Sequence, residues 1–283
     1  MSMASWAHDI SLGLATLLFG YFMGGLLPFT WRCLQHRGLP FRDPHLEARR
    51  RSPLVPRWAM YYLVWAIAPL ERALIRLQVF PNSVTLASLG LSLIAAVALG
   101  LGFFDLGGWL FLLSGILDIL DGRVARATAR VSPAGALFDS VLDRYAEFLA
   151  YAGLLLYYRD EWVFFAVLGL QLGSFMISYS RARGEGLGVA GDVGTMQRPE
   201  RILLLGCALG GAPFLAHFLE PTAVRPFFHL AAGAVTVLAV ASNLTAAARF
   251  RHIYRALRGA DKRVPEPTKG ARSAAAESAR PAA

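Results

Sequence analysis

Residues 118–143 read DILDGRVARATARVSPAGALFDSVLD and contain four aspartates, at positions 118, 121, 139 and 143. The sequence on either side of this stretch is almost uninterruptedly apolar. A carboxylate in such surroundings is energetically costly, and charged residues inside a membrane usually serve a function. The aspartate stretch is therefore the first candidate site, and its interpretation depends on where each aspartate lies in the fold.

The composition is that of a membrane protein that crosses the bilayer several times. Of the 283 residues, 55% are hydrophobic and 17% are charged, which is too apolar for a soluble domain. The formal net charge of +9 would suggest nucleic acid as the partner of a soluble protein. In a membrane protein the distribution of basic residues among the loops matters more. We therefore expect a lipid environment and no nucleic-acid partner.

The lengths of the apolar segments predict an all-α, polytopic fold. A helix needs about 20 residues to cross the hydrocarbon layer of a bilayer. The seven expected spans lie at roughly residues 10–31, 84–104, 107–130, 134–158, 161–180, 200–219 and 226–248.

The remaining segments complete the predicted organisation. The stretch 58–70 is too short to span comfortably and is expected to lie as a helix in the membrane interface. The first span has a longer apolar part than a signal peptide and no small-residue cleavage site after it, so we expect an extra retained helix. The predicted parts are an N-terminal helix with a basic connector (1–57), a membrane domain (58–258) and a disordered tail (259–283).

The basic residues set the expected orientation. Nine lysines and arginines lie in residues 32–81, three in 123–130, four in 181–201 and nine from residue 249 onward, whereas the opposite loops contribute only two. Cytoplasmic loops are enriched in Lys and Arg. We therefore expect an integral protein of the cytoplasmic membrane, with the aspartates and the C-terminus facing the cytoplasm and the N-terminus outside.

Helix geometry brings the two pairs of aspartates to a similar depth. Asp118 and Asp121 lie about 16 and 21 Å along a helix that enters from the outer side. The Ser-Pro pair at 132–133 is a start signal for the next helix, with an N-cap and a proline in the first turn. Asp139 and Asp143 then lie about 6 and 12 Å from the start of that helix. We therefore expect four carboxylates to converge.

Four neighbouring carboxylates repel one another unless a cation lies between them. A divalent ion that prefers oxygen ligands fits this arrangement, with Mg²⁺ as the expected ion and Mn²⁺ as the alternative. Gly122 and Ala125 leave room for a phosphate-bearing ligand, and Arg126 offers a bidentate donor to a phosphate oxygen. The residues predict a metal–diphosphate site. The alternative is a set of helix-end carboxylates paired with Arg123, Arg126 and Arg144.

The aspartate stretch resembles the signature of the CDP-alcohol phosphotransferases. That signature reads Asp, two residues, Asp-Gly, two residues, Ala-Arg, eight residues, Gly, three residues, Asp, three residues and Asp, and this chain matches it at every fixed position. The resemblance extends over roughly residues 58–250 and includes the Pro-Asn-Ser-Val-Thr run that begins at Pro81. It implies a six-helix core and a homodimer, with the first span as an addition to the core.

The resemblance also implies a reaction and roles for individual residues. The family transfers the phosphatidyl group of CDP-diacylglycerol to the hydroxyl of a small polar alcohol and releases CMP, a step of phospholipid biosynthesis. By this resemblance Asp118, Asp121, Asp139 and Asp143 hold the metal, and Asp143 is also the base that deprotonates the acceptor. The residues implied for the donor site are Asn82, Thr85, Asp118, Gly122, Ala125, Arg126 and Gly135.

The acceptor alcohol is indicated by the segment SYSRARGEGLGVAGDVGTMQRPERILLL, which begins at residue 178. Arg181, Arg198 and Arg201 are the candidate acceptor residues, because guanidinium groups suit a phosphorylated alcohol. The segment resembles the branch that makes phosphatidylinositol phosphate from inositol 1-phosphate. Many relatives with phosphorylated acceptors have a basic residue just before the motif glycine, where this chain has Pro133 and Ala134. Glycerol 3-phosphate and free inositol therefore stay open as alternatives.

Two other classes of protein compete with this interpretation. A membrane prenyltransferase also holds a diphosphate with Mg²⁺ and aspartates, but it is expected to carry two distant Asp-rich motifs. An ion transporter would need matching charges in the outer half of the membrane, and the sequence shows none. Glu147 continues the row of Asp139 and Asp143. It is expected to orient Arg144, to touch the acceptor or to form a structural ion pair.

Overall fold

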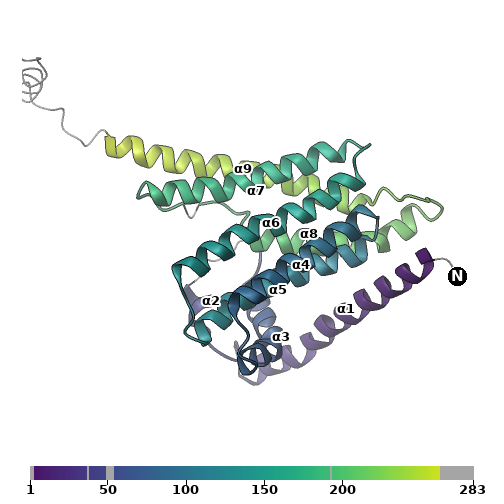
Figure 1. Cartoon of the computed structure of the whole chain (residues 1–283), viewed down its shortest axis with the longest axis horizontal. Coiled ribbons are helices and arrows are strands. Elements are labelled where there is room, and N and C mark those ends of the chain that lie inside the picture. Colours follow the sequence, from purple (N-terminus) through teal and green to yellow (C-terminus); the bar gives the residue numbers. More distant parts are fainter. Residues whose placement is uncertain (1–2, 37, 49–53, 192, 262–283) are drawn as a thin grey trace, which may run out of the picture.

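The structure of the protein, a computed structural model, describes residues 3–36, 38–48, 54–191 and 193–261. Over these residues the chain is helical and contains no β-strand, which confirms the predicted all-α fold (Figure 1). The helices are α1 (Met3–Gln35), α2 (Pro44–Ala48), α3 (Arg57–Arg76), α4 (Pro81–Gly100), α5 (Phe104–Ala127), α6 (Pro133–Tyr157), α7 (Val163–Gly186), α8 (Arg198–Leu219) and α9 (His229–Asp261).

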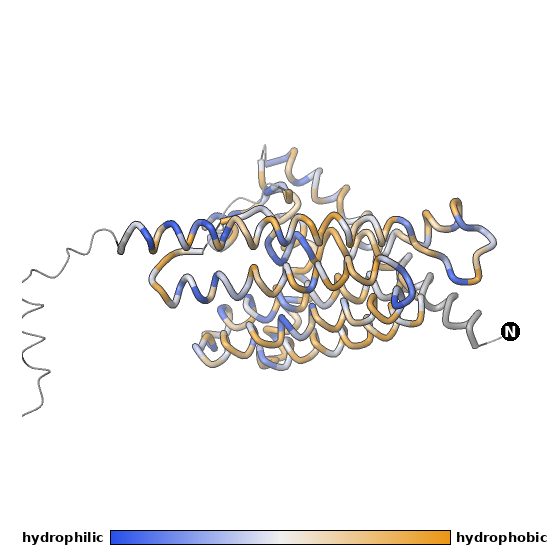
Figure 2. Tube along the Cα trace, turned by 90° about the horizontal axis from the view of Figure 1, so that it is seen from above, coloured by the Kyte–Doolittle hydropathy of each residue, from blue (hydrophilic) through white to orange (hydrophobic). Residues whose placement is uncertain are grey.

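The protein is an integral membrane protein. Among the described residues, five helices are long and apolar enough to cross a membrane by length and composition, and they lie in α1, α4, α7, α8 and α9. α5 and α6 have 24 and 25 residues, which is sufficient in length, but they carry the charges of the aspartate stretch. The seven predicted spans thus divide into five apolar helices and two charged ones. Figure 2 shows mostly hydrophobic residues along the middle of the bundle.

Close helix contacts hold the bundle together. α4 packs against α5 and α6, α5 packs against α8, and α9 packs against α7 and α8. Gly153 of α6 faces the backbone of Ala96 in α4, and Gly108 of α5 faces the backbone of Gly206 and Gly210 in α8. A Cβ has no room at Gly153 or Gly108, and such small residues allow helix backbones to approach each other within a membrane.

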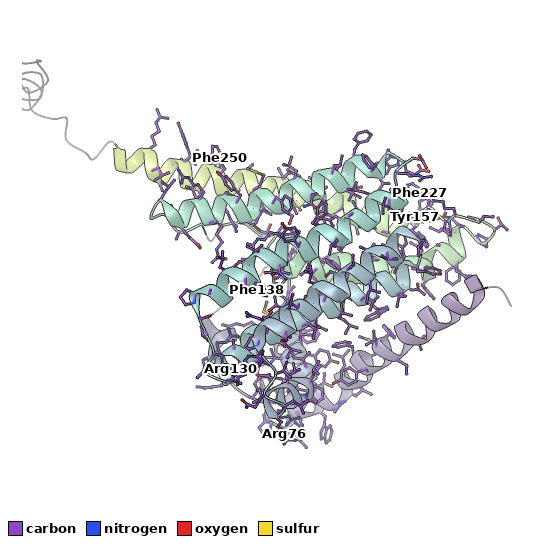
Figure 3. The ribbon with its side chains drawn as sticks, viewed as in Figure 1. Arg76, Arg130, Phe138, Tyr157, Phe227 and Phe250 are labelled. Carbon is purple, nitrogen blue, oxygen red and sulfur yellow. The ribbon has the colours of Figure 1, made fainter. Side chains whose placement is uncertain are left out.

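An aromatic cluster closes the end of the bundle where α5 begins and α6 ends. Phe104 stacks on Phe228 with 4.2 Å between the ring centroids, and Tyr157 meets Phe104 edge-on at 4.7 Å. In Figure 3, Tyr157 lies near this end and Arg130 lies near the other. The aspartates lie in the later part of α5 and the early part of α6, so they are remote from the aromatic cluster.

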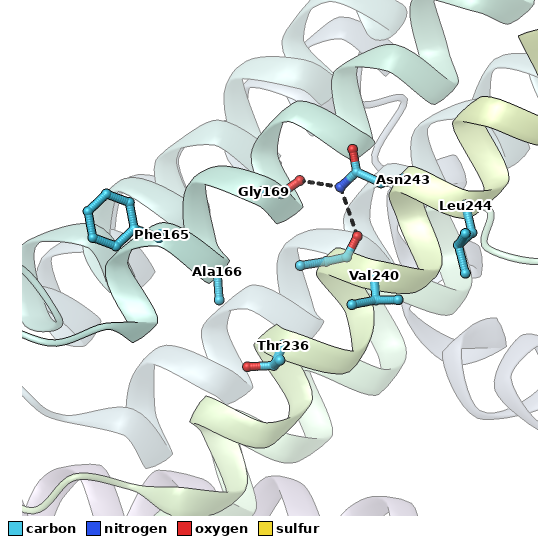
Figure 4. A pocket seen from close by; sticks show the side chains of 8 residues that line it. Phe165, Ala166, Gly169, Thr236, Val240, Asn243 and Leu244 are labelled. Carbon is cyan, nitrogen blue, oxygen red and sulfur yellow. Dashed lines mark hydrogen bonds between the residues drawn. The ribbon is translucent and has the colours of Figure 1, made fainter.

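An amide group joins α9 to α7 inside the bundle. The Nδ2 atom of Asn243 donates to the carbonyl of Gly169 at 2.8 Å and to the carbonyl of Ala239 at 2.9 Å (Figure 4). Beside it lies a groove of about 510 Å³ whose lining includes Phe165 and Val240 and no charged residue. This groove is therefore distinct from the aspartate site.

Several helix boundaries differ from the predictions. α4 begins at Pro81, three residues early, because proline is favourable in the first turn of a helix. α9 continues to Asp261, past the predicted end at residue 248, because no proline lies between residues 249 and 261. Residues 259–261, the first three of the predicted tail, therefore belong to α9. The rest of it, 262–283, lies outside the described residues.

The segment before the bundle folds as α2 and α3. The sequence did not predict α2, a five-residue helix capped by Asp43, whose carboxylate accepts the backbone N–H of Leu46 at 3.2 Å. α3 covers the stretch predicted as an interfacial helix, but its bounds are Arg57–Arg76 rather than 58–70, and it continues through Pro69. Together they form the connection between α1 and the bundle.

Gly153→Ala is expected to lower the melting temperature of the purified protein in detergent. The added Cβ would collide with the backbone of Ala96, and overpacking of this kind costs about 1–3 kcal/mol. Gly90→Ala is the matched control, since a Cβ at this glycine of α4 meets no heavy atom within 4 Å. Equal melting temperatures of the two variants would contradict the close contact of α4 and α6.

Candidate functional site

Three of the four aspartates meet between the last turns of α5 and the first turns of α6. One carboxylate oxygen from each of Asp118, Asp121 and Asp139 lies within 4.8 Å of the other two. Ser132 caps α6 by accepting the N–H of Gly135 at 3.0 Å, which confirms the predicted start signal. This cap fixes where α6 begins and so sets the depth at which its aspartates face those of α5.

The first turns of α4 border the aspartates. Thr85 donates from Oγ1 to Oδ2 of Asp121 at 2.7 Å, and both residues are 4% exposed. Asn82 lies beside Gly135, where its Oδ1 atom is 3.8 Å from the position that a Cβ would take. Two residues predicted for the donor site, Asn82 and Thr85, therefore lie next to the signature residues of α5 and α6.

Asp139 has a carboxylate oxygen suited to a cation. Its Oδ1 atom is buried and has no hydrogen-bond partner within the part of the chain that the structure describes. A buried polar atom without a partner is costly. Three carboxylates also form the all-oxygen ligand set that a hard divalent cation prefers. The residues present therefore fit the expected divalent metal.

α8 places Arg198 beside the aspartates. Its Nη1 atom lies 2.5 Å from Oδ2 of Asp118 and 2.7 Å from Oδ2 of Asp143. Its Nε atom is buried and finds no hydrogen-bond partner among the described residues. A guanidinium with an unused donor at the edge of this site is suited to bind an oxyanion.

Arg201 lies one turn further along α8 and is paired with Glu147 of α6. Its Nε and Nη2 atoms donate to the two carboxylate oxygens of Glu147 at 2.8 and 3.0 Å, and Ser174 donates to the same carboxylate at 2.7 Å. Arg201 is 1% exposed and Glu147 is 3% exposed. Glu147 thus forms a structural ion pair, and the predicted contact of Arg201 with an acceptor would require this pair to open.

The other predicted residues lie on both sides of the aspartates. Gly122 is covered by the guanidinium of Arg126, whose Nη1 atom would be 3.2 Å from a Cβ at this glycine. Ala125 lies on the same helix, one position before Arg126, and is half-buried. Arg181 pairs with Glu185 at 2.8 Å at the exposed end of α7. The structure therefore brings Arg126 and Arg198 to the site and leaves Arg181 at its periphery.

The alternative interpretation, in which neighbouring arginines pair with the aspartates, is met among the described residues only by Arg144 and Asp143. Arg123 points away from them and donates to Glu71 at 2.8 Å and to Asp43 at 2.7 Å. Arg144 comes only within 3.8 Å of Asp143. The sequence missed the contacts of Arg123 with Asp43 and Glu71, because these partners lie far from it along the chain.

The amino-acid sequence matches the family model for CDP-alcohol phosphatidyltransferase over residues 78–238. It is 36% identical over 197 residues to the phosphatidylinositol phosphate synthase of Mycobacteroides abscessus, and the alignment covers 68% of this chain and 84% of that relative. It is 32% identical over 218 residues to the phosphatidylinositol phosphate synthase of Mycobacterium tuberculosis, with 72% of this chain and 92% of that relative covered.

Solved structures of the Mycobacterium tuberculosis phosphatidylinositol phosphate synthase share the fold. The structure with CDP-DAG bound has a TM-score of 0.57 and 28% identity, over 66% of this chain and 92% of that chain. The structure in complex with manganese and citrate has a TM-score of 0.58 and 28% identity, over 66% and 88%. With the complete aspartate signature and its convergent geometry, these matches establish that the chain belongs to the CDP-alcohol phosphatidyltransferase family.

Proposed function

We propose that this chain transfers the phosphatidyl group of CDP-diacylglycerol to a hydroxyl of inositol 1-phosphate, forming phosphatidylinositol phosphate and releasing CMP. The observation that carries the proposal is the position of Arg198, which touches Asp118 and Asp143 and keeps a buried donor for an anion. The names of the Mycobacteroides and Mycobacterium relatives and the CDP-DAG bound to one of them support the same reaction.

The divalent metal would be held by the aspartates of the signature. Asp118, Asp121 and Asp139 offer oxygens at the closest spacing, and Asp143 completes the predicted set. Mg²⁺ is the proposed ion, with Mn²⁺ as the alternative, as in one of the similar structures. When bound, the ion neutralises the diphosphate and stabilises the departing CMP. Thr85 keeps the carboxylate of Asp121 oriented through its hydrogen bond.

The donor is proposed to lie along the last turns of α5 and the first turn of α4. Gly122 has no side chain there, so a phosphate can approach the helix backbone, and Arg126 above it can donate to a phosphate oxygen. The proposed donor residues are Asn82, Thr85, Asp118, Gly122, Ala125, Arg126 and Gly135.

Asp143 is proposed to take the proton of the acceptor hydroxyl. Arg198 lies 2.7 Å from this carboxylate, so a phosphorylated alcohol held by Arg198 brings its hydroxyl close to Asp143. The hydroxyl oxygen forms a bond to the phosphorus that carries the diacylglycerol. The bond from that phosphorus to the CMP oxygen breaks, its electron pair leaves with CMP, and the proton passes to Asp143.

The acceptor phosphate is proposed to bind the basic side chains of α7 and α8. Arg198 is the principal candidate because it has a buried, unused donor. Arg181 is proposed at the periphery, where it also pairs with Glu185. Arg201 is retained as a residue of the acceptor region that acts through Glu147, because their bidentate pair holds α8 against α6.

We further propose that the site and the C-terminus face the cytoplasm, that the N-terminus lies outside and that the protein is a homodimer. The excess of basic residues in the segments that border the aspartates supports the orientation. The dimer follows from the family resemblance.

Purified protein supplied with CDP-diacylglycerol is expected to release CMP when inositol 1-phosphate and Mg²⁺ are both present, and to stop when the metal is removed with EDTA. CMP release is measured in a screen against inositol 1-phosphate, free inositol, glycerol 3-phosphate and serine. Greater activity with free inositol would support the alternative suggested by Pro133 and Ala134. No CMP release with any acceptor would refute the phosphatidyltransferase assignment.

Asp143→Asn is expected to lower kcat by about 10²- to 10⁴-fold, because an amide cannot take the proton of the acceptor hydroxyl. Binding of CDP-diacylglycerol, measured by isothermal titration calorimetry, should change little. Asp160→Asn is the control, since this exposed aspartate lies just past the opposite end of α6. Wild-type turnover in Asp143→Asn would exclude the base assignment.

Arg198→Ala is expected to lower kcat/KM for inositol 1-phosphate by about 10- to 150-fold, the equivalent of about 1.5–3 kcal/mol for a lost charged hydrogen bond. The KM for CDP-diacylglycerol should barely change. Arg126→Ala should instead raise the KM for CDP-diacylglycerol and barely change kcat/KM for inositol 1-phosphate, because Arg126 lies beside Gly122 on the donor side. If both variants changed the two substrates alike, the separation of donor and acceptor residues would be wrong.

A further inference from the structure

The N-terminal arm, which comprises α1, residues 38–43 and α2, lies outside the residues matched by the family model. Aromatic contacts dock it on α3. Phe29 meets Tyr62 with 5.3 Å between ring centroids, and Phe41 meets Tyr61 at 5.2 Å. The arm is therefore attached to the interfacial helix rather than separate from the enzyme.

An ionic cluster extends this attachment to α5. Arg123 donates from Nε to Glu71 of α3 at 2.8 Å and from Nη1 to Asp43 of the arm at 2.7 Å. The three side chains are at most 17% exposed. The second carboxylate oxygen of Asp43 accepts the N–H of Leu46 at the start of α2. One carboxylate thus joins the arm and α5, and one guanidinium joins the arm, α3 and α5.

The cluster holds α5 at the turn that carries the proposed donor residues. Arg123 directly follows Gly122 and precedes Arg126 by three positions. At about 100° per residue, Arg123 lies on the side of the helix opposite Asp121. Arg123 lies about 60° from Arg126 and about 100° from Gly122 around the helix. The two ion pairs therefore hold α5 on the face next to these two donor residues. Charge-assisted hydrogen bonds from two nitrogens of one planar guanidinium fix its orientation as well as its position.

We infer that Asp43 and Glu71 are positioning residues that act through Arg123 on the donor side of α5. The N-terminal arm then helps to position the donor residues of α5, although it lies outside the core that the family model matches. This inference rests on the proposed function, because it assigns the α5 turn to the CDP-linked donor.

Asp43→Asn tests the ionic role separately from the cap. Asparagine can still accept the N–H of Leu46, but its neutral side chain no longer forms an ion pair with Arg123. We expect the KM for CDP-diacylglycerol to rise about tenfold, with the acceptor KM unchanged and partial recovery in Asp43→Glu. Glu71→Gln should act in the same direction. Glu47→Gln is the matched control, since Glu47 is exposed on α2.

Hydrogen–deuterium exchange provides a readout that does not depend on turnover. Residues 121–127 should exchange faster in Asp43→Asn and Glu71→Gln than in the control. Wild-type donor KM and wild-type exchange in both variants would overturn the inference, as would an equal rise of donor and acceptor KM. If the wild-type protein failed to bind CDP-diacylglycerol in calorimetry, the proposed function would fall, while the exchange data would still decide whether the cluster holds α5.

Discussion

A carboxylate buried in a bundle is costly unless it has a partner, and several carboxylates near this site have their partners on other helices. Asp121 on α5 receives a hydrogen bond from Thr85 on α4, and Arg198 on α8 reaches aspartates on both α5 and α6. Glu147 on α6 is held by Arg201 on α8. Removing one partner of a buried pair costs about 3–5 kcal/mol. The contacts that neutralise the acids are therefore also the contacts that set the register of the four helices around the site.

The ion pairs between α6 and α8 form two layers with different surroundings. Asp143 and Arg198 make the outer layer, with side chains 14% and 20% exposed. Glu147 and Arg201 make the inner layer, one helical turn away and almost fully buried. Both layers pair a carboxylate with a guanidinium, but they differ in how deeply they are buried. In the proposed function the outer pair exchanges partners with the substrate, whereas the inner pair is enclosed and is hydrogen-bonded to Ser174 as well.

The sequence predicted those features that depend on neighbours along the chain. The convergence of Asp118, Asp121 and Asp139, the Ser132 cap and five of the seven predicted apolar spans follow from helix geometry and are present in the structure. Contacts between segments that lie far apart in the sequence could not be predicted in this way. Arg198 was identified only as one of several basic residues, and nothing in the spacing distinguished it from the enclosed Arg201. The pairing of Arg123 with Asp43, 80 positions away, required the folded arrangement of the arm.

The aromatic cluster formed by Phe104, Tyr157 and Phe228 affects whether water or protons could pass through the bundle. Protons cross membrane proteins along chains of water or of titratable side chains, and four aspartates would supply the first part of such a chain. Rings packed with centroids 4.2 and 4.7 Å apart leave no space for a file of water between them. The core between this cluster and the aspartates also contains buried apolar side chains such as Phe111 and Leu154, which cannot take part in a proton relay.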